Sequence, residues 1–487
     1  MRTTVKTFLL LLCSVLVMSG TIDLSNLFNY GNQNIPPYIV EDNTAGNPIT
    51  DEGATLGRVL FYDKKLSSDN TIACASCHQQ SFAFSDTSVL SQGVNGQTGR
   101  HSMRLINARF AAEDHFFWDE RADSLEMQVT MPIQDHLEMG FSGTNGDPNM
   151  ADLLQKLDAI PYYNDLFYLA FGDTMITEDR MQKALAQFVR SIQSFDSKFD
   201  QGLAAVNGNL NANFPNFTQD ENTGKQLFLQ PATFAGGANP TGNRTGGGLG
   251  CQGCHNAPEF DIAANSGNNG VITVANNPGA TDLTITRSPS LRDMFDANGN
   301  LNGPLMHDGS MATFNAVLTH YNDITHNPII NPDLDPRLTG TAGPPGAGLP
   351  GPGQKLLMTA QERVAITAFM KTLTGSDVYT NVKWSNPFDS NGSLTLTGSV
   401  LSTIHPLVEA IEFTAFPNPV VGEVNFKGEL ENTRLVITTV QGQLLHDINV
   451  FDDFVRVDLS DLSTGIYLVS VYNEENQLVG NRKLIKQ

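Results

Sequence analysis

The sequence predicts a mainly α-helical protein in which two similar domains follow one another and a small β-sandwich completes the chain. A Cys-x-x-Cys-His motif occurs twice, at Cys74–His78 and at Cys251–His255. The segments around the two motifs resemble each other, which indicates a duplicated domain. After about residue 385, short runs of alternating apolar and polar residues replace the helical pattern, as is typical of β-strands.

The first 20 residues have the pattern of a secretory signal peptide. Arg2 and Lys6 form a positive region, and an apolar stretch from Phe8 to Met18 follows it. This stretch is too short for a membrane-spanning helix. The sequence therefore predicts export to the periplasm, the cell surface or the extracellular medium.

The composition is that of a folded protein with an acidic surface. The 487 residues are 40% hydrophobic and 16% charged, which is enough to form roughly two to four domains with buried cores. Lys and Arg number 29 against 51 for Asp and Glu, a net charge of −22, which argues against nucleic-acid binding. The acidic surface either serves solubility alone or attracts a basic partner such as a small electron-transfer protein.

The repeat extends beyond the motifs themselves. DEGATLGRVLFYDKKLSSDNTIACASCH corresponds to DENTGKQLFLQP, a Gly-rich insertion and CQGCH, so each motif follows a predicted short helix and a loop. Downstream, FFWDERADSLEMQV corresponds to PLMHDGSMATFNAVL, which aligns Trp118 with His307. We therefore predict two domains, a linker and a β-sandwich, at residues 21–200, 201–385, 386–411 and 412–487.

Two further helices are predicted from apolar spacing. Residues 177–200 carry apolar side chains at helical intervals, among them Leu185 and Ile192, which predicts a long amphipathic helix. Thr359–Leu373 is predicted as a helix that Thr359 caps, with Glu362 completing a capping box.

Every cysteine beyond the predicted signal peptide belongs to one of the two motifs: Cys74, Cys77, Cys251 and Cys254. Two thiols on one helical turn can form thioethers with the vinyl groups of a heme, and the following histidine can bind its iron. The alternatives are a redox dithiol, a zinc site and a structural disulfide. A thioredoxin-type site needs a strand–helix setting, which this sequence lacks around both motifs. A zinc site built from all four cysteines would leave both histidines unexplained. We therefore predict two covalently bound heme c groups in cytochrome c-like domains.

Several motifs, in this order, resemble those of the bacterial diheme cytochrome c peroxidases and their MauG-type relatives. They are LGRVLFYDKKLSSDNTIACASCH, FWDERADSLE, PIQDHLEMG, CQGCH and LMHDGSMATF, and the resemblance covers about residues 45–380. It implies that His78 binds the iron of the peroxide-reacting heme and His255 that of the electron-accepting heme. It also implies that Trp118 lies between the hemes, and that Glu138 and Gln128 line the peroxide pocket. Without the resemblance, Trp118 would be read as a core aromatic and Glu138 as a surface carboxylate.

The chain departs from the family pattern at the distal side of the first heme. Most of these peroxidases hold a histidine on the loop after the first motif, which closes the iron until the second heme is reduced. The matching position in SQGVNGQTGRHSM is Val94, and the nearby His101 aligns with a different residue. The resemblance then implies a first heme that is open without reductive activation, as in MauG-type enzymes.

A second departure concerns the far axial ligand of the second heme. The matching position is Tyr321, where most peroxidases have methionine and MauG-type enzymes have tyrosine, while Met306, Met311 and His320 are rival ligands. A phenolate would lower the potential of that heme.

The resemblance also implies a calcium ion between the domains. Its backbone ligands would lie near Asn302 and Pro304. The family's asparagine ligand appears here as Ser102, which puts the ion in question.

The expected function is that of a diheme peroxidase, which reduces hydrogen peroxide to water with electrons from an external donor such as a small cytochrome c or cupredoxin. One alternative is a MauG-like enzyme that oxidises a protein or organic substrate with peroxide. Another is a surface electron-transfer cytochrome without peroxide turnover. A homodimer is a further expectation.

The end of the chain resembles the sorting domains of type IX secretion. The resemblance rests on FPNPV near the start of the predicted β-sandwich and GIYLVSVY near its end. It implies recognition by a secretion machinery. An ordinary β-domain that docks the enzyme or a partner is the alternative.

Overall fold

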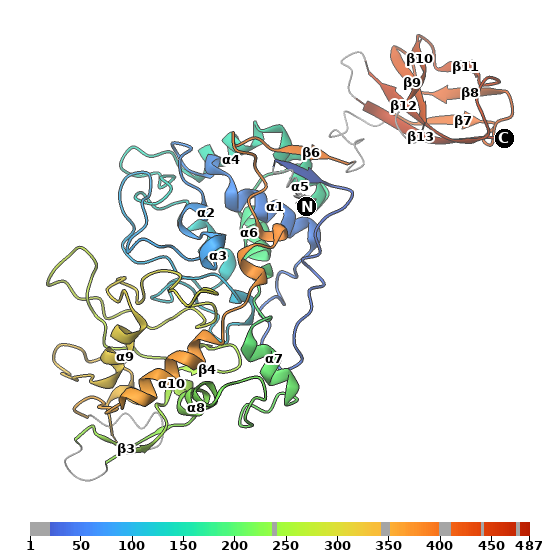
Figure 1. Ribbon diagram of the computed structural model, residues 1–487. Coiled ribbons are helices and arrows are strands. Elements are labelled where there is room, and N and C mark those ends of the chain that lie inside the picture. Colours follow the sequence, from blue (N-terminus) through green and yellow to red (C-terminus); the bar gives the residue numbers. More distant parts are fainter. Residues whose placement is uncertain (1–19, 236–240, 342–350, 399–410, 440–442, 474–477) are drawn as a thin grey trace, which may run out of the picture. The chain divides into compact units, whose positions relative to one another are not determined.

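The computed structural model describes residues 20–235, 241–341, 351–398, 411–439, 443–473 and 478–487. Residues 1–19 of the predicted signal peptide, and parts of the predicted linker and Gly-rich loops, lie outside the described residues. The chain forms two compact units, Met1–Thr397 and Gly398–Gln487 (Figure 1). In the described parts of the chain, no helix has both the length and the apolar character needed to cross a membrane.

Helices supply most of the regular structure of the larger unit, and long loops connect them (Figure 1). The helices are α1 (Asp51–Tyr62), α2 (Cys74–Cys77), α3 (Leu125–Thr130), α4 (Met150–Asp158), α5 (Pro161–Phe171), α6 (Glu178–Ser191), α7 (Lys198–Ala205), α8 (Gln219–Leu229), α9 (Phe314–Asn322) and α10 (Ala360–Lys371). Short strands pair as β2 (Ala232–Phe234) with β3 (Arg244–Gly247), β4 (His255–Asn256) with β5 (Asp261–Ile262), and β1 (Thr21–Asp23) with β6 (Thr395–Thr397).

Two pairs of helices cross in the same way, α1 over α6 and α8 over α10. A Cβ on Gly57 of α1 would lie 2.0 Å from the carbonyl oxygen of Ala184 in α6. A Cβ on Gly224 of α8 would lie at the same distance, 2.0 Å, from the carbonyl oxygen of Ala365 in α10. Each glycine thus lets two helix backbones touch, and the two crossings repeat each other within the larger unit.

The turns before Trp118 and His307 also match. Phe117 and Met306, the residues just before them, both have positive φ, at 72° and 71°. An antiparallel bridge closes each turn. The bridges join Phe116 to Ala122 and Leu305 to Met311. The alignment of Trp118 with His307 therefore has a counterpart in backbone geometry.

The two helices predicted from apolar spacing have different outcomes. The predicted helix at Thr359–Leu373 is confirmed by α10, whose N-cap Thr359 forms the capping box with Glu362. The prediction of one long helix over residues 177–200 is wrong beyond Ser191, where α6 ends. Asn107 fixes the segment after Ser191 in a non-helical conformation through two hydrogen bonds. The Asn107 N–H donates to the Ile192 carbonyl oxygen at 2.9 Å, and the Asn107 side-chain oxygen accepts from Ser194 N–H at 2.8 Å.

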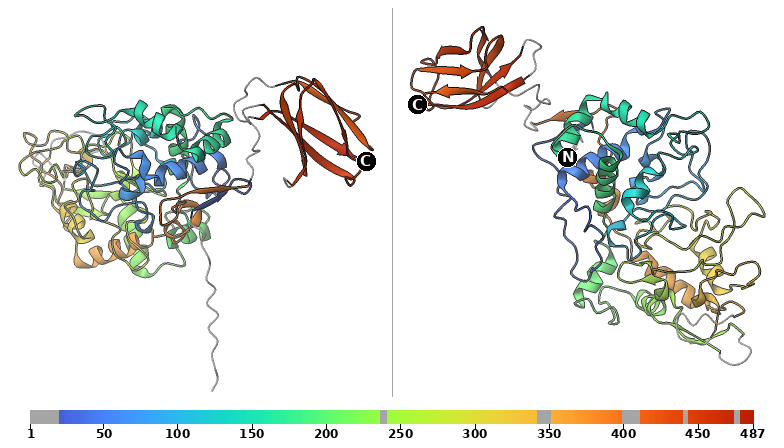
Figure 2. Two further views of the ribbon diagram at one scale, coloured as in Figure 1. Left: turned by 90° about the horizontal axis from the view of Figure 1, so that it is seen from above. Right: turned by 180° about the vertical axis from the view of Figure 1, so that it is seen from behind.

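The smaller unit consists of antiparallel strands (Figure 2). One sheet has the order β10 (Leu444–Val450), β9 (Thr433–Thr439), β12 (Gly465–Tyr472), β13 (Leu478–Lys486), and the other β11 (Phe454–Asp458), β8 (Glu423–Gly428), β7 (Phe413–Phe416). Alternate residues of both sheets are buried in one cluster, which includes Phe426 of β8, Ile437 of β9 and Val469 of β12. The period-two pattern in the sequence marks this region correctly as β-structure.

Candidate functional site

The first Cys-x-x-Cys-His motif forms a single helical turn, α2. The Ala73 N–H donates to the Ser76 hydroxyl at 3.0 Å, and the His78 N–H donates to the Cys74 carbonyl oxygen at 2.9 Å. The turn brings both thiols to one side of the chain with the histidine directly behind them. His78 Nδ1 lies 3.3 Å from the Phe84 carbonyl oxygen, so in the tautomer that donates this bond, Nε2 is left free to bind a metal.

The four motif cysteines are free and half-buried in the structure. Burial raises the pKa of Cys74, Cys251 and Cys254 to about 12 and that of Cys77 to about 11. The side chains are therefore thiols at neutral pH and not the thiolates of a reactive redox pair. Neither pair is closed as a disulfide, which leaves the sulfurs available for covalent attachment of a heme.

Glu138 lies beside the first motif on a tight turn. Its N–H donates to Asp135 Oδ1 at 3.1 Å, and its carbonyl oxygen accepts from Val94 N–H at 2.9 Å. Burial, with a smaller contribution from Asp135, raises the pKa of Glu138 to about 7. Glu138 in turn contributes to the raised pKa values of Cys74 and Cys77, after their own burial. A carboxyl group poised near neutrality therefore adjoins the motif.

Val94 packs against this same turn. A Cβ on Gly140 would lie 2.8 Å from Val94 Cγ2, so the valine side chain touches the backbone just after Glu138. His101 is buried with its Nδ1 at 2.9 Å from the Ser88 carbonyl oxygen, and it lines the cavity beside the second motif. Gln128 is half-buried on α3, and within the described chain its side chain has no hydrogen bond to Glu138 or His78.

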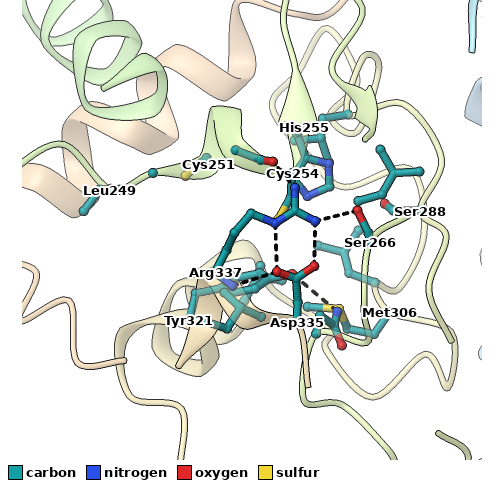
Figure 3. A pocket seen from close by; sticks show the side chains of 18 of the residues that line it. Leu249, Cys251, Cys254, His255, Ser266, Ser288, Met306, Tyr321, Asp335 and Arg337 are labelled. Carbon is teal, nitrogen blue, oxygen red and sulfur yellow. Dashed lines mark hydrogen bonds and ion pairs between the residues drawn. The ribbon is translucent and has the colours of Figure 1, made fainter. Parts of the chain in front are cut away.

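The second motif borders a cavity of about 530 Å³ (Figure 3). Cys251 begins a short 3-10 turn, and Cys251, Cys254 and His255 all line the cavity. Burial, followed by the nearby Arg337 charge, lowers the pKa of His255 to about 4, which keeps the imidazole neutral. Its Nδ1 is buried and has no hydrogen-bond partner among the described residues. A cavity of this size, with free thiols and a neutral imidazole on its wall, fits a covalently held heme.

Tyr321 and Met306 lie together on the wall of this cavity (Figure 3). The side-chain amide of Asn269 donates to Tyr321 Oη at 3.3 Å and to Met306 Sδ at 3.4 Å. Burial raises the pKa of the Tyr321 phenol above its ordinary value. Of the other rivals, His320 Nε2 lies 2.9 Å from the Asn269 carbonyl oxygen, and neither His320 nor Met311 lines the cavity.

Two side-chain groups of this cavity were missed in the sequence. Asn269 lies in the stretch NSGNNG, whose composition signals only a turn. The other is an ion pair in which Arg337 Nη2 and Nε lie 2.6 and 2.8 Å from the carboxylate oxygens of Asp335 (Figure 3). Arg337 also donates to the Gly253 carbonyl oxygen inside the second motif, so it ties a distant loop to the heme-attachment turn.

Trp118 connects residues from both halves of the larger unit. Its indole N–H donates to the His101 carbonyl oxygen at 2.7 Å, and its own carbonyl oxygen accepts from Thr286 and Arg287 N–H at 3.0 and 3.1 Å. Its ring lies 6.3 Å from that of His307, centroid to centroid. Trp118 also lines the cavity beside the second motif, so it borders the second site while bonding to the first half.

The segment predicted to bind calcium lies where the two halves touch. A Cβ on Gly303 would lie 2.1 Å from the Asp86 carbonyl oxygen. The Asn302 side-chain amide donates to the Asp293 carbonyl oxygen and to Tyr379 Oη, both at 2.8 Å. In the part of the chain that the structure describes, no group of three His, Cys, Asp or Glu side chains is arranged to hold a metal ion.

Comparison with known proteins gives consistent relatives. Residues 51–207 match the family model for di-haem cytochrome c peroxidase, and residues 414–487 match that for the secretion system C-terminal sorting domain. The chain is 31% identical over 284 residues to methylamine utilization protein MauG of Methylorubrum extorquens, which covers 56% of this chain and 70% of that protein. It is 28% identical over 338 residues to cytochrome c551 peroxidase of Nitrosomonas europaea, which covers 68% of this chain and 82% of that protein. The crystal structure of a MauG-like protein associated with microbial copper homeostasis matches with a TM-score of 0.55 and 26% identity, over 74% of this chain and 99% of that one.

Proposed function

The chain belongs to the family of diheme cytochrome c peroxidases and MauG proteins, and we propose that it reduces hydrogen peroxide to water with two electrons from an external donor. The donor would be a small cytochrome c or a cupredoxin. Glu138 carries this proposal, because it is a half-buried carboxyl group near the first motif whose pKa is raised to about 7.

The residues present fit two heme c groups. Cys74 and Cys77 would hold the first and Cys251 and Cys254 the second, with iron bound by the histidine that follows each pair. Bound heme supplies an iron centre that can take up peroxide or exchange electrons. The free thiols at both motifs and the cavity beside the second support this assignment.

Glu138 would move the proton that peroxide cleavage requires. As a carboxylate it accepts a proton from one peroxide oxygen, and as the acid it returns that proton to the other oxygen as water leaves. A pKa of about 7 suits both steps near neutral pH, since neither protonation state is strongly disfavoured. We assign Gln128 to the same pocket as a hydrogen-bonding group. Trp118, with its contacts to both halves, would lie on the route of electrons from the second site to the first.

The larger unit would then consist of two tandem cytochrome c-like domains, residues 21–200 and 201–385. The repeated helix crossings at Gly57 and Gly224 support this division. The strands of residues 412–487 would form a β-sandwich around their shared core.

The proposal is tested by loading and turnover of the full chain. Purified holoprotein should contain two covalent hemes, and it should oxidise a reduced small cytochrome c only when peroxide is added. Two hemes without peroxide-dependent oxidation of any donor would instead support a surface electron carrier.

A MauG-like oxidation of a protein or organic substrate is the second candidate. Two observations favour it: Val94 lies against the Glu138 turn, and Tyr321 lines the second cavity. Peroxide-driven oxidation of an added organic substrate without a redox-protein donor would select this function.

We further propose that backbone oxygens near Asn302 and Pro304 bind a calcium ion that links the two domains. The close approach of Gly303 to Asp86 supports a link at this point. Dialysis against a calcium chelator should then slow electron exchange between the hemes, and added calcium should restore it.

The C-terminal unit would direct export. The match of residues 414–487 to a secretion sorting domain supports recognition by a type IX machinery, and residues 1–20 would act as the signal peptide. Fractionation of producing cells, with the mass of the mature chain, distinguishes periplasmic, surface-attached and released protein and shows whether the sorting domain is removed.

A further inference from the structure

Two adjacent tyrosines lie on α5, which packs against the helix that precedes the first motif, and they take no part in the function proposed above. Tyr162 and Tyr163 stand in the first turn of α5. Both hydroxyls donate to the same oxygen, Oδ2 of Asp63, at 2.6 and 2.8 Å. Their rings lie 4.8 Å apart, centroid to centroid. The two phenols therefore share one proton acceptor and are in van der Waals range of each other.

The pair extends from the first motif to the surface. Asp63 directly follows α1, which packs against both α2 and α5. Tyr163 is fully buried, and its pKa is raised by burial, then by Asp63 and Tyr162, and also by the Cys74 thiol. Tyr162 is partly exposed. The inner tyrosine thus lies within electrostatic range of the heme-attachment cysteine, on a helix that packs against the same α1 as the first motif, and the outer one meets solvent.

Asp63 is placed to receive protons from both phenols. A tyrosine that loses an electron becomes a strong acid, so its oxidation is much easier when a base accepts the proton at once. Asp63 is buried, and its second oxygen, Oδ1, accepts from Lys65 N–H at 2.9 Å. Acceptance on both oxygens is the pattern of an ionised carboxylate. The Lys65 ammonium donates to Tyr162 Oη at 3.1 Å, which leaves that hydroxyl hydrogen directed to Asp63.

We propose that Tyr163 and Tyr162 form a proton-coupled electron path between the surface and the first heme site, by which the protein oxidises phenolic one-electron donors. The path is separate from the one through Trp118. The inference rests on the proposed function, since peroxide supplies the oxidising equivalents.

The steps balance in electrons and protons. Tyr163 gives one electron to the oxidised first site and its phenolic proton to Asp63 Oδ2. Tyr162 then returns an electron to Tyr163, which recovers its proton from Asp63, and the Tyr162 proton passes to the same oxygen. A phenol at the surface reduces Tyr162, which takes its proton back from Asp63, while the proton of the phenol enters the solvent. Two phenols thus supply the two electrons for one peroxide, and the peroxide takes up two protons to give two waters.

A purely structural role for the pair would anchor α5 to the end of α1. Phenylalanine substitutions separate the two roles, because they retain the ring and remove the oxidisable hydroxyl. Tyr62→Phe is the matched control. Its hydroxyl, on α1, donates to the Trp384 carbonyl oxygen at 2.7 Å and not to a carboxylate.

The test is electron paramagnetic resonance of the full-length holoprotein, frozen within milliseconds of mixing with hydrogen peroxide. Wild type and Tyr62→Phe should give a neutral tyrosyl signal that Tyr163→Phe abolishes, because Tyr163 is the first tyrosine to be oxidised. Peroxide-dependent oxidation of guaiacol should fall about tenfold or more in Tyr162→Phe and Tyr163→Phe. Oxidation of a reduced small cytochrome c should be unchanged in both variants.

Consumption of peroxide without a tyrosyl signal, or a signal that Tyr163→Phe leaves intact, would overturn the inference while the proposed function stands. If the holoprotein consumes no peroxide, the proposed function fails separately. The path is then tested with a ruthenium photo-oxidant, which withdraws electrons without peroxide. A tyrosyl signal lost in Tyr162→Phe but kept in Tyr62→Phe supports the path, and its absence in wild type overturns it.

Discussion

The two Cys-x-x-Cys-His regions share a motif and differ in what surrounds it. His78 Nδ1 lies 3.3 Å from a backbone carbonyl oxygen, whereas His255 Nδ1 is buried without a partner among the described residues. Near the first region lies a half-buried carboxyl group, Glu138, whose pKa burial raises to about 7. The second adjoins a cavity on whose wall Tyr321 and Met306 share the amide of one asparagine.

Under the proposed function, the difference would let two similar sites perform two tasks. Attachment chemistry is the same at both motifs, because it depends on a five-residue stretch. The surrounding loops differ, so one site has a carboxyl group to which we assign proton transfer, and the other has a phenol and a thioether, side chains of the kinds that bind heme iron. A hydrogen bond to the free nitrogen of a ligating histidine also makes it a stronger donor, which separates the two sites further.

The largest effect is expected from removing the proton-transfer group of the first site. Glu138→Gln should lower peroxide turnover by about 10²–10⁴-fold, the usual contribution of a general acid–base group. The measurement is the initial rate of peroxide-dependent oxidation of reduced cytochrome c. Glu41→Gln, at an exposed carboxyl group, is the matched control and should leave the rate unchanged. Equal rates in Glu138→Gln and wild type would remove the assigned difference between the two sites.

The pH dependence of peroxide turnover should also depend on Glu138. Glu138 accepts a proton only as a carboxylate, and its pKa is raised from 4.5 to about 7. Turnover should therefore rise with pH up to about 7 and fall by about tenfold per unit below it. A wild-type profile that is flat between pH 5 and 8 would contradict this assignment.

A smaller effect is expected at the second site. Tyr321→Phe should shift the potential of one heme by on the order of 100 mV, because axial ligands tune heme potentials strongly. Met306→Leu is the matched comparison, because Met306 accepts a hydrogen bond from the same Asn269 amide as Tyr321. This variant should leave the heme potential near the wild-type value. Spectroelectrochemical titration measures both. The reverse outcome would assign the far ligand to Met306.

The smallest effect is expected on stability, at the helix crossings of α1 with α6 and of α8 with α10, where matched substitutions should destabilise the protein equally. Gly57→Ala and Gly224→Ala each place a methyl group against a helix backbone, at 2.0 Å from a carbonyl oxygen in both cases. Each should lower the free energy of unfolding by about 1–3 kcal/mol, as overpacking does. Gly99→Ala, with no neighbouring atom within 4 Å, serves as the control. Denaturant titration would contradict the repeat if only one of the two variants were destabilised.

Short-range patterns made much of this predictable. Both motifs, the helices before them, the α10 capping box and the strands of the C-terminal unit follow from residues close in sequence. The break between α6 and α7 does not, because Asn107 imposes it from far along the chain. Apolar spacing continues through the break, since Ile192 is buried although it is not helical.

The candidate sites divide in the same way. Cysteines and histidines of the motifs were identified from spacing, and Glu138 and Trp118 only from the resemblance to a family. Asn269, Arg337 and Asp63 were missed. Each lies in a turn whose sequence carries no further signal, and its contact with a distant segment (Tyr321, Gly253 or the two tyrosines of α5) forms only in the folded chain.

Stopped-flow optical spectroscopy of the fully oxidised diheme protein, mixed with hydrogen peroxide in the absence of reductant, tests the central claim most directly. A rapid change in heme absorption is expected, because Val94 at the Glu138 turn has no atom that can bind the iron of the first site. If absorption changed only after one electron per molecule had been added, another residue would have to close that site. No change in either state would contradict peroxide chemistry at the first motif altogether.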